Sequence, residues 1–220
     1  MYIGVLGTGT VGRTLAQALV DRGHEVRMGA RAAGNETAVA WAQEAGPLAS
    51  EGSFADAAAY GELAINATAG AASLDALEMA GAGERLAGKV LIDVANPLDT
   101  SKGMPPTLTL CNDDSLGESI QRALPEVRVV KALNTVTAAV MVQPGLVAGE
   151  HTMFVCGNDE VAKAQVQDLL EGFGWARARI LDLGDITAAR GMEMYLPLWL
   201  RLWGATGSPI LNVGVHLAAD

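Results

Sequence analysis

The chain has 220 residues, half of them hydrophobic and only 18% charged, and it contains 26 glycines. This composition is typical of a well-buried α/β protein with one main core and excludes a disordered chain. The formal net charge of −10 at pH 7 repels phosphate backbones and anionic lipid, so we expect neither a nucleic acid nor a membrane surface as a partner.

Local sequence features argue against two further classes of protein. No basic leader segment precedes the first apolar run. The most apolar stretch, residues 194–205, is interrupted by Pro197 and Arg201 and falls short of the roughly 20 residues that a membrane span needs. Cys111 and Cys156 have no metal-ligand spacing with each other or with the three histidines. We therefore expect a cytoplasmic protein without a metal site.

Strands and helices alternate along the first half of the chain. Apolar runs predict strands over residues 2–6, 24–28, 63–68 and 90–94, and helical spacing predicts helices over residues 11–19, 36–45, 53–60 and 73–82. Gly23 and Gly46 follow two of these helices, at positions where a glycine can end a helix without strain. This alternation is typical of parallel strands joined by helices.

The second half continues the alternation and ends differently. A loop begins at Asn96-Pro97, and the pattern then predicts helices over residues 115–124 and 160–173 and strands over residues 128–133, 153–156 and 178–183. After Asp185 the chain is helical and rich in Met, Leu and Trp. We predict an α/β Rossmann NAD(P)-binding domain with a doubly wound, mainly parallel sheet over residues 1–183. Residues 184–220 form a small C-terminal helical element that is not an independent domain and serves a substrate pocket or a dimer contact.

A glycine loop follows the first predicted strand and opens the first predicted helix. Residues Gly7, Thr8, Gly9, Thr10, Val11 and Gly12 match the G-x-G-x-x-G pattern of dinucleotide-binding proteins in the strand–turn–helix context that the pattern requires. Gly7 permits the tight turn, Gly9 lets the backbone approach a pyrophosphate, and Gly12 lets the helix pack closely. The pyrophosphate would lie on N–H groups of the first helical turn. The alternative is a structural turn that binds nothing.

The end of the second strand indicates which dinucleotide is bound. NAD-selective sites place an acidic residue there for the ribose 2′-hydroxyl, whereas this sequence has Gly29-Ala30-Arg31. A guanidinium can form paired hydrogen bonds with a 2′-phosphate. We therefore expect NADP(H) as the cofactor and Arg31 as its selectivity residue; the alternative is that Arg31 is an ordinary surface arginine.

Three further segments matter: Asn96-Pro97, residues 131–135 and residues 182–202. With these and the motifs above, the sequence resembles the coenzyme F-420-dependent NADP oxidoreductase family. The resemblance implies a Rossmann domain with a C-terminal part that helps to form a deazaflavin pocket and a dimer contact. It also implies hydride transfer between NADP(H) and coenzyme F-420 as co-substrate, by a homodimer. This sequence has Asn134 in place of a histidine and Thr68-Ala69-Gly70 in place of Ile-Pro-Trp of archaeal members, so F-420, a flavin or another small oxidant remain as acceptors.

Site residues follow from the resemblance by position. Contacts with the cofactor are expected from the glycine loop, from Arg31, and from Thr68, Ala69, Asn96, Pro97 and Leu133 at the ends of strands. Asn134 and Thr135 are candidates for orienting the acceptor ring or the carboxamide, and no general acid or base is assigned. Trp199 and Trp203 could cover a ring or meet a second subunit, and we favour a dimer contact.

Two other functions remain open at this stage. An NADP-dependent dehydrogenase of the β-hydroxyacid type begins with a similar half and uses a lysine as general acid, but it adds a large helical domain. Lys131 lies within a predicted strand, and only about thirty-five residues follow Asp185. A sensor or regulatory Rossmann protein that binds NADPH without oxidising it is the second alternative.

Overall fold

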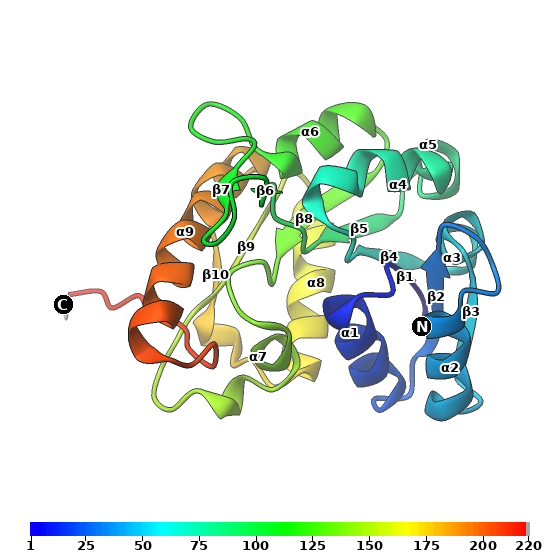
Figure 1. Ribbon diagram of the computed structural model, residues 1–220, viewed down its shortest axis with the longest axis horizontal. Coiled ribbons are helices and arrows are strands. Elements are labelled where there is room, and N and C mark those ends of the chain that lie inside the picture. Colours follow the sequence, from blue (N-terminus) through cyan, green and yellow to red (C-terminus); the bar gives the residue numbers. More distant parts are fainter. Residues whose placement is uncertain (219–220) are drawn as a thin grey trace.

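The structure, a computed structural model, describes residues 1–218. The main sheet contains β1 (Tyr2–Leu6), β2 (Glu25–Ala30), β3 (Ala49–Ser53), β4 (Leu63–Asn66), β5 (Val90–Asp93), β8 (Arg128–Ala132), β9 (Met153–Gly157) and β10 (Ile180–Asp182). Its strand order is β10-β9-β8-β5-β4-β1-β2-β3 (Figure 1), and all neighbours are parallel except β8 and β9. The doubly wound, mainly parallel Rossmann-type sheet is confirmed.

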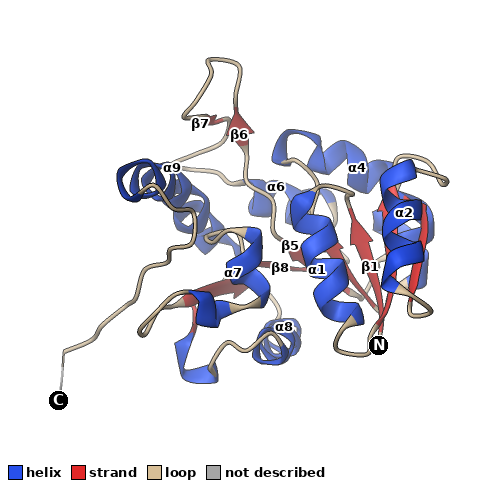
Figure 2. Ribbon diagram, turned by 60° about the horizontal axis from the view of Figure 1, so that its bottom comes forward, coloured by secondary structure: helices blue, strands red, loops and turns tan. Residues whose placement is uncertain are grey.

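Helices cover both faces of this sheet (Figure 2). The helices are α1 (Thr10–Val20), α2 (Glu36–Ala45), α3 (Phe54–Tyr60), α4 (Ser73–Met79), α5 (Ala82–Arg85), α6 (Leu116–Ala123), α7 (Ala138–Val142), α8 (Glu160–Gly172) and α9 (Ala189–Thr206). One hydrophobic cluster joins the sheet to α1, α2, α7 and α8. A second cluster joins its other face to α3, α4, α5, α6 and α9. Among residues 1–218, no helix combines the length and apolarity that crossing a bilayer demands.

Several short elements differ from the sequence-based prediction. The strand β3 was missed because its sequence, Ala-Ser-Glu-Gly-Ser, lacks apolar alternation. A small hairpin of β6 (Leu98–Asp99) and β7 (Thr107–Leu108) lies within the expected loop and projects from the body (Figure 2). The predicted helix over residues 73–82 is interrupted at Gly81, which adopts a left-handed conformation (φ 59°).

The C-terminal segment is helical only in its first part. α9 follows a short 3-10 turn and ends at Gly207, which adopts the left-handed conformation typical of a helix stop. The described residues after Ser208 form neither helix nor strand, whereas the sequence predicted helix throughout. This segment contacts the start of β9, where the N–H of Thr152 donates to the Val213 carbonyl at 2.9 Å.

The two cysteines have opposite surroundings. Cys156 lies in β9 and is fully buried, and burial raises the pKa of its thiol to about 12. Cys111 is exposed in the loop between β7 and α6. Neither is in a disulfide.

Candidate functional site

The glycine loop between β1 and α1 leaves space on one side only. Gly7 has φ +122°, and a Cβ there would lie 2.6 Å from the Ala67 carbonyl oxygen on the neighbouring strand end. A Cβ on Gly12 would collide with the backbone of Gly7. A Cβ on Gly9, by contrast, would meet no protein atom within 4 Å. Gly7 and Gly12 are therefore required by the fold, whereas Gly9 faces open space that a ligand can occupy.

The N-terminus of α1 faces the same open space. Its cap residue is Gly9, no side chain caps its N–H groups, and no acidic residue lies in its first turn. The first-turn N–H groups and the positive end of the helix dipole are therefore free to bind an anion. Capping by Asn35 and Ser53 at α2 and α3 shows that other helices of the chain meet this need internally.

A cleft of about 620 Å³ connects this loop to the end of β2. Four groups of residues line it: Gly7, Thr8 and Gly9 of the glycine loop; Ala30–Asn35 after β2; Phe54, Ala72, Asp75, Ala76 and Met79 from α3 to α4; and Ala67, Thr68 and Ala69 after β4. The cleft therefore brings together the predicted pyrophosphate loop, the predicted 2′-phosphate residue Arg31, and Thr68 and Ala69, two of the other residues expected to contact the cofactor.

Arg31 is exposed at this cleft and is available for a ligand. Within the described chain its guanidinium forms neither an ion pair nor a side-chain hydrogen bond. By contrast, Arg22 donates to backbone carbonyls and Arg190 donates to Glu118. A free cation beside an uncapped helix N-terminus suits an anionic group such as a phosphate. The residues of the cleft thus fit a phosphorylated dinucleotide.

Thr10, Val11 and Gly12 of the predicted loop lie in the first turn of α1 and are not among the residues that line this cleft. The other predicted site residues lie beyond the ends of β5 and β8 and do not line it either. Asn96 and Asn134 bond each other twice, because each side-chain amide donates to the other residue at 2.9 Å. Leu133, which lies between the end of β8 and Asn134, is buried and has φ +65°, a strained conformation for a leucine. Pro97 is buried beside Asn96. In a Rossmann sheet, the nicotinamide half of a dinucleotide binds at this edge of the sheet, formed by the carboxyl ends of the strands.

Asn134 has a narrower potential role than the sequence indicated. Its side-chain nitrogen donates to Asn96 Oδ1 and to the Met192 carbonyl at 3.1 Å, so that nitrogen is already used by the protein. Its Oδ1 and the Thr135 Oγ1 are buried without a hydrogen-bond partner among the described residues. These two oxygens fit an amide N–H such as that of a carboxamide, since a buried unpaired acceptor is costly.

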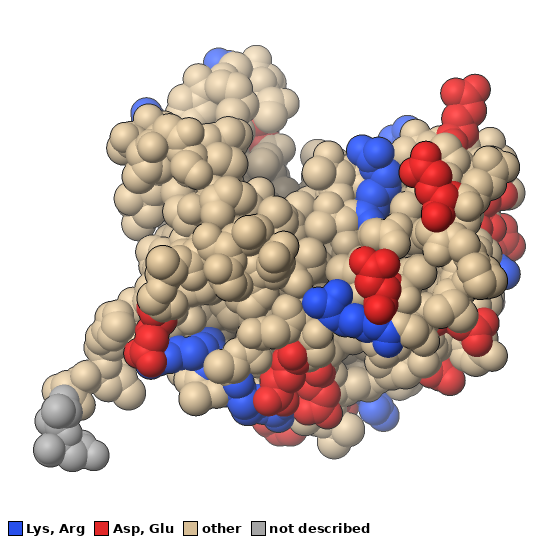
Figure 3. Space-filling model, turned by 90° about the horizontal axis from the view of Figure 1, so that it is seen from below, with Lys and Arg blue, Asp and Glu red and all other residues tan. Residues whose placement is uncertain are grey.

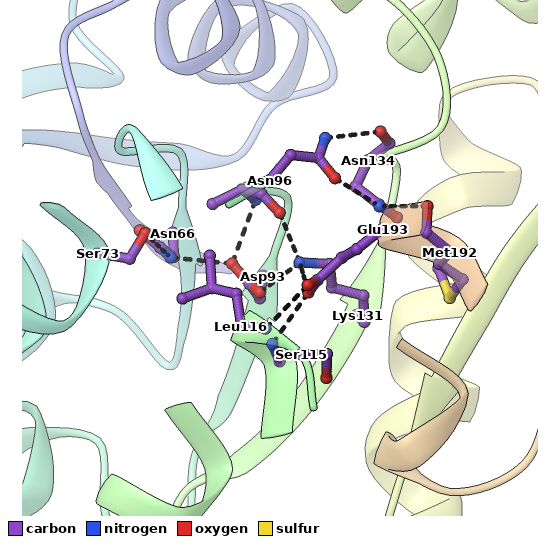
Figure 4. Close-up of polar contacts among 12 residues, drawn as sticks. Asn66, Ser73, Asp93, Asn96, Ser115, Leu116, Lys131, Asn134, Met192 and Glu193 are labelled. Atoms are coloured by element: carbon purple, nitrogen blue, oxygen red, sulfur yellow. Dashed lines mark hydrogen bonds and ion pairs between the residues drawn. The ribbon is translucent and has the colours of Figure 1, made fainter. Parts of the chain in front are cut away.

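A buried charge cluster lies directly below this edge (Figure 4). Lys131 Nζ is 2.8 Å from Asp93 Oδ2, 2.7 Å from Glu193 Oε1 and 2.5 Å from the Ala95 carbonyl. Burial favours the neutral amine, but the carboxylates of Asp93 and Glu193 outweigh it and raise the pKa of Lys131. All three ammonium protons are used within the protein. Lys131 therefore cannot act as the general acid of a β-hydroxyacid-type dehydrogenase.

Sequence reasoning missed this cluster because its members lie on different elements. Asp93 ends β5, Lys131 lies in β8 and Glu193 lies in α9. Two signals were available: Asp93 follows three apolar residues in β5, and Lys131 lies between apolar residues in β8. Charged residues at such positions are buried only when paired.

Comparison with known proteins agrees with this geometry. The sequence profile of the family described as "NADP oxidoreductase coenzyme F420-dependent" matches residues 2–97. A crystal structure from Arthrobacter sp. FB24, provisionally assigned as an F-420-dependent NADP reductase, is 53% identical, has a TM-score of 0.91, and is matched over 98% of this chain and 99% of that one. The chain belongs to the coenzyme F-420-dependent NADP oxidoreductase family.

Two curated relatives extend the comparison. The F-420-dependent NADP reductase of Methanocaldococcus jannaschii is 36% identical over 120 residues, which are 54% of this chain and 52% of that protein. The Metalloreductase STEAP3 of Rattus norvegicus is 28% identical over 201 residues, which are 90% of this chain and 37% of that protein. The matches thus span about half, or less, of each curated relative. Membership of this NADP oxidoreductase family confirms the resemblance and the cofactor class expected from the glycine loop and Arg31.

Proposed function

We propose that this member of the family transfers a hydride between NADP(H) and coenzyme F-420 or a similar flavin-like acceptor. The observation that carries the proposal is that one cleft is faced both by the N-terminus of α1, which no side chain caps, and by the guanidinium of Arg31, which has no partner among residues 1–218. The names of the relatives from Arthrobacter and Methanocaldococcus support F-420 as the acceptor.

In this proposal, protein residues mainly bind and orient. NADPH supplies the hydride from its reduced nicotinamide ring. The glycine loop and the first turn of α1 hold the pyrophosphate, and Arg31 holds the 2′-phosphate. Asn134 Oδ1 and Thr135 Oγ1 accept from the carboxamide or the acceptor ring. Hydride transfer needs aligned rings in a site protected from water, and it needs little acid–base assistance from side chains.

The proposal includes the cell compartment and the assembly state. The free, exposed thiol of Cys111 is typical of a reducing compartment, which supports a cytoplasmic location.

α9 presents Met194, Leu198 and Trp203 to solvent, with 37%, 55% and 39% of their surfaces exposed. Seen from below, the α9 side of the molecule is mostly free of charged side chains, whereas acidic and basic side chains mix on the opposite side (Figure 3). We propose a homodimer through this face. Trp199 is buried, so we do not include it in the proposed contact.

The test is NADPH oxidation, followed by its absorbance, with F-420, FMN and menadione in parallel. We expect turnover with F-420, and we expect Arg31→Ala to raise the KM for NADPH by about ten- to a hundredfold, the effect of losing charge-assisted hydrogen bonds. The KM for NADH should not change. Arg128→Ala, an exposed arginine at the amino end of β8, is the matched control and should behave as wild type. Tight NADPH binding without turnover by any acceptor would instead indicate a sensor.

A further inference from the structure

The cluster of Asp93, Lys131 and Glu193 is more deeply buried than any other ion pair among the described residues. The side chains of Asp93 and Lys131 are fully buried and that of Glu193 is 1% exposed. The other ion pairs each include a partner that is at least about a third exposed. Burying charges is costly, and apolar residues of similar volume commonly stabilise a core equally well. The cluster therefore calls for an explanation beyond stability.

Glu193 connects three elements through one carboxylate (Figure 4). Its Oε1 accepts from Lys131 of β8 and from the Gly117 N–H at 3.0 Å, and its Oε2 accepts from the Leu116 N–H at 2.8 Å. The two N–H groups belong to the first turn of α6, so the helix dipole helps to balance the second acidic charge. Gly117 is packed so closely that a Cβ there would lie 2.9 Å from the Ala189 Cβ. One residue thus fixes α9 to both the sheet and α6.

Hydrogen bonds lead from the cluster to the two sides of the proposed site. On one side, Asp93 Oδ1 accepts from the Asn66 amide at 2.9 Å, and Asn66 Oδ1 accepts from the Thr68 hydroxyl at 2.7 Å. Thr68 lines the cofactor cleft. On the other side, the residue before Glu193 is Met192, whose carbonyl accepts from Asn134. The cluster therefore connects the cofactor cleft with α9 and Asn134.

We propose that Glu193 and Lys131 are positioning residues: they hold α9 and Asn134 in register with the nicotinamide end of the cleft. The role in turnover rests on the proposed function, because it concerns the acceptor side of that site. Neither side chain reaches the cofactor cleft; both act through Met192 and Asn134. The carboxylate of Glu193 is required because both its oxygens accept from N–H donors.

The variant Glu193→Gln tests this role at constant volume. The amide places an N–H₂ against either the Leu116 N–H or the donors at Oε1, so one contact becomes donor against donor. We expect kcat/KM for the acceptor to fall about tenfold or more, while the Kd for NADPH changes less than about twofold, because the cleft itself is intact. If this variant does not fold, Glu193→Asp keeps the charge but is one methylene shorter, and we expect the same split.

The matched control removes a partner of the other buried lysine. Lys163 is 2% exposed and lies 2.8 Å from Asp182, on α8 and β10. Asp182→Asn should lower stability without altering the acceptor kinetics. Equal kinetic effects of Glu193→Gln and Asp182→Asn would show a general loss of stability and would overturn the proposal.

A double-mutant cycle tests the route through Asn134. If Glu193 acts through Asn134, the double variant should have a kcat/KM less than about twofold below that of Asn134→Ala alone. A full, additive loss in that background would overturn this route.

Hydrogen exchange of the backbone separates this inference from the proposed function. Glu193→Gln should selectively lose protection in α9 and in residues 133–136, and Asp182→Asn should not. If none of the tested acceptors supports NADPH oxidation by the wild-type protein, the proposed function fails. Hydrogen exchange alone then decides whether the cluster positions these two segments. Unchanged protection in Glu193→Gln would overturn the inference in either case.

Discussion

Gly7 and Gly9 belong to one motif, yet their surroundings differ completely. Gly7 combines a positive φ with a close approach to Ala67, so a side chain there would strain the backbone and collide with it. Gly9 has an ordinary extended conformation (φ −71°, ψ −179°) and no protein neighbour in the direction of its missing Cβ. Gly7 is thus required by the fold, whereas Gly9 leaves space that a ligand can occupy.

This difference predicts opposite outcomes for two alanine variants. Gly9→Ala should unfold at the wild-type temperature but bind NADPH at least about tenfold more weakly, because its methyl group occupies the pyrophosphate position. Gly7→Ala should lose about 2 kcal/mol or more of unfolding free energy from strain and overpacking. Thermal unfolding and NADPH titration measure the two properties separately. Wild-type NADPH affinity in Gly9→Ala would contradict the assignment of this loop.

Residues with a local signature were predictable, and residues defined by distant partners were not. The glycine loop and Arg31 act within a short strand–turn–helix–strand segment, so their spacing alone predicted the cleft that the structure brings together. Asn134 was named from the family resemblance, and its hydrogen bonds to Asn96 and Met192 depend on how distant elements pack. The same dependence hid the partners of Lys131.

At the level of elements, segments with a clear apolar pattern were predicted and segments without one were not. The strands β1, β4, β5 and β8 and the helices α1, α2 and α8 follow their predicted ranges within a few residues. β3 is mostly polar, β6 and β7 have two residues each, and the five residues of α7 are too few to show the period of a helix. Tertiary contacts stabilise such elements, and a sequence shows those contacts only indirectly.

The pairing of α6 with α9 predicts a pH dependence of stability. The Arg190 guanidinium donates two hydrogen bonds to Glu118, at 2.6 and 2.8 Å, and with the Ser115 hydroxyl it lowers the pKa of Glu118 despite partial burial. A carboxylate whose pKa is lower when folded contributes stability above its unfolded pKa, and that stability is lost as the pH falls through the folded pKa. The protein should therefore lose stability in acid, below the ordinary glutamate range.

The Glu118→Gln variant isolates this contribution. It should be less stable than wild type at neutral pH, and the difference should shrink as the pH falls below the ordinary glutamate range. Urea unfolding across a pH series gives the difference directly. A difference that stays constant down to strongly acidic pH would show that the charge of Glu118 contributes nothing to the α6–α9 contact.

For the whole molecule, the proposed homodimer predicts the effect of a single charge on α9. Leu198→Glu places a carboxylate at the centre of the exposed apolar face and should convert a dimer into a monomer, because an unpaired buried charge is unfavourable in an interface. Val161→Glu on α8, where the valine is 70% exposed, is the matched control and should keep the assembly state. Light scattering after size-exclusion chromatography reports the mass. A wild-type monomer at micromolar concentration would contradict the dimer.

The opposite surroundings of the two cysteines make the native protein suitable for fluorescence measurements. A maleimide dye reacts with thiolates, so it would attach to exposed Cys111 and leave buried Cys156 unmodified. Cys111 precedes Asn112, whose N–H lies 3.4 Å from the Met194 Sδ of α9. The attached dye would therefore report on changes in the surroundings of the β7–α6 loop next to α9 during titration with cofactor or acceptor, and no cysteine would have to be introduced or removed.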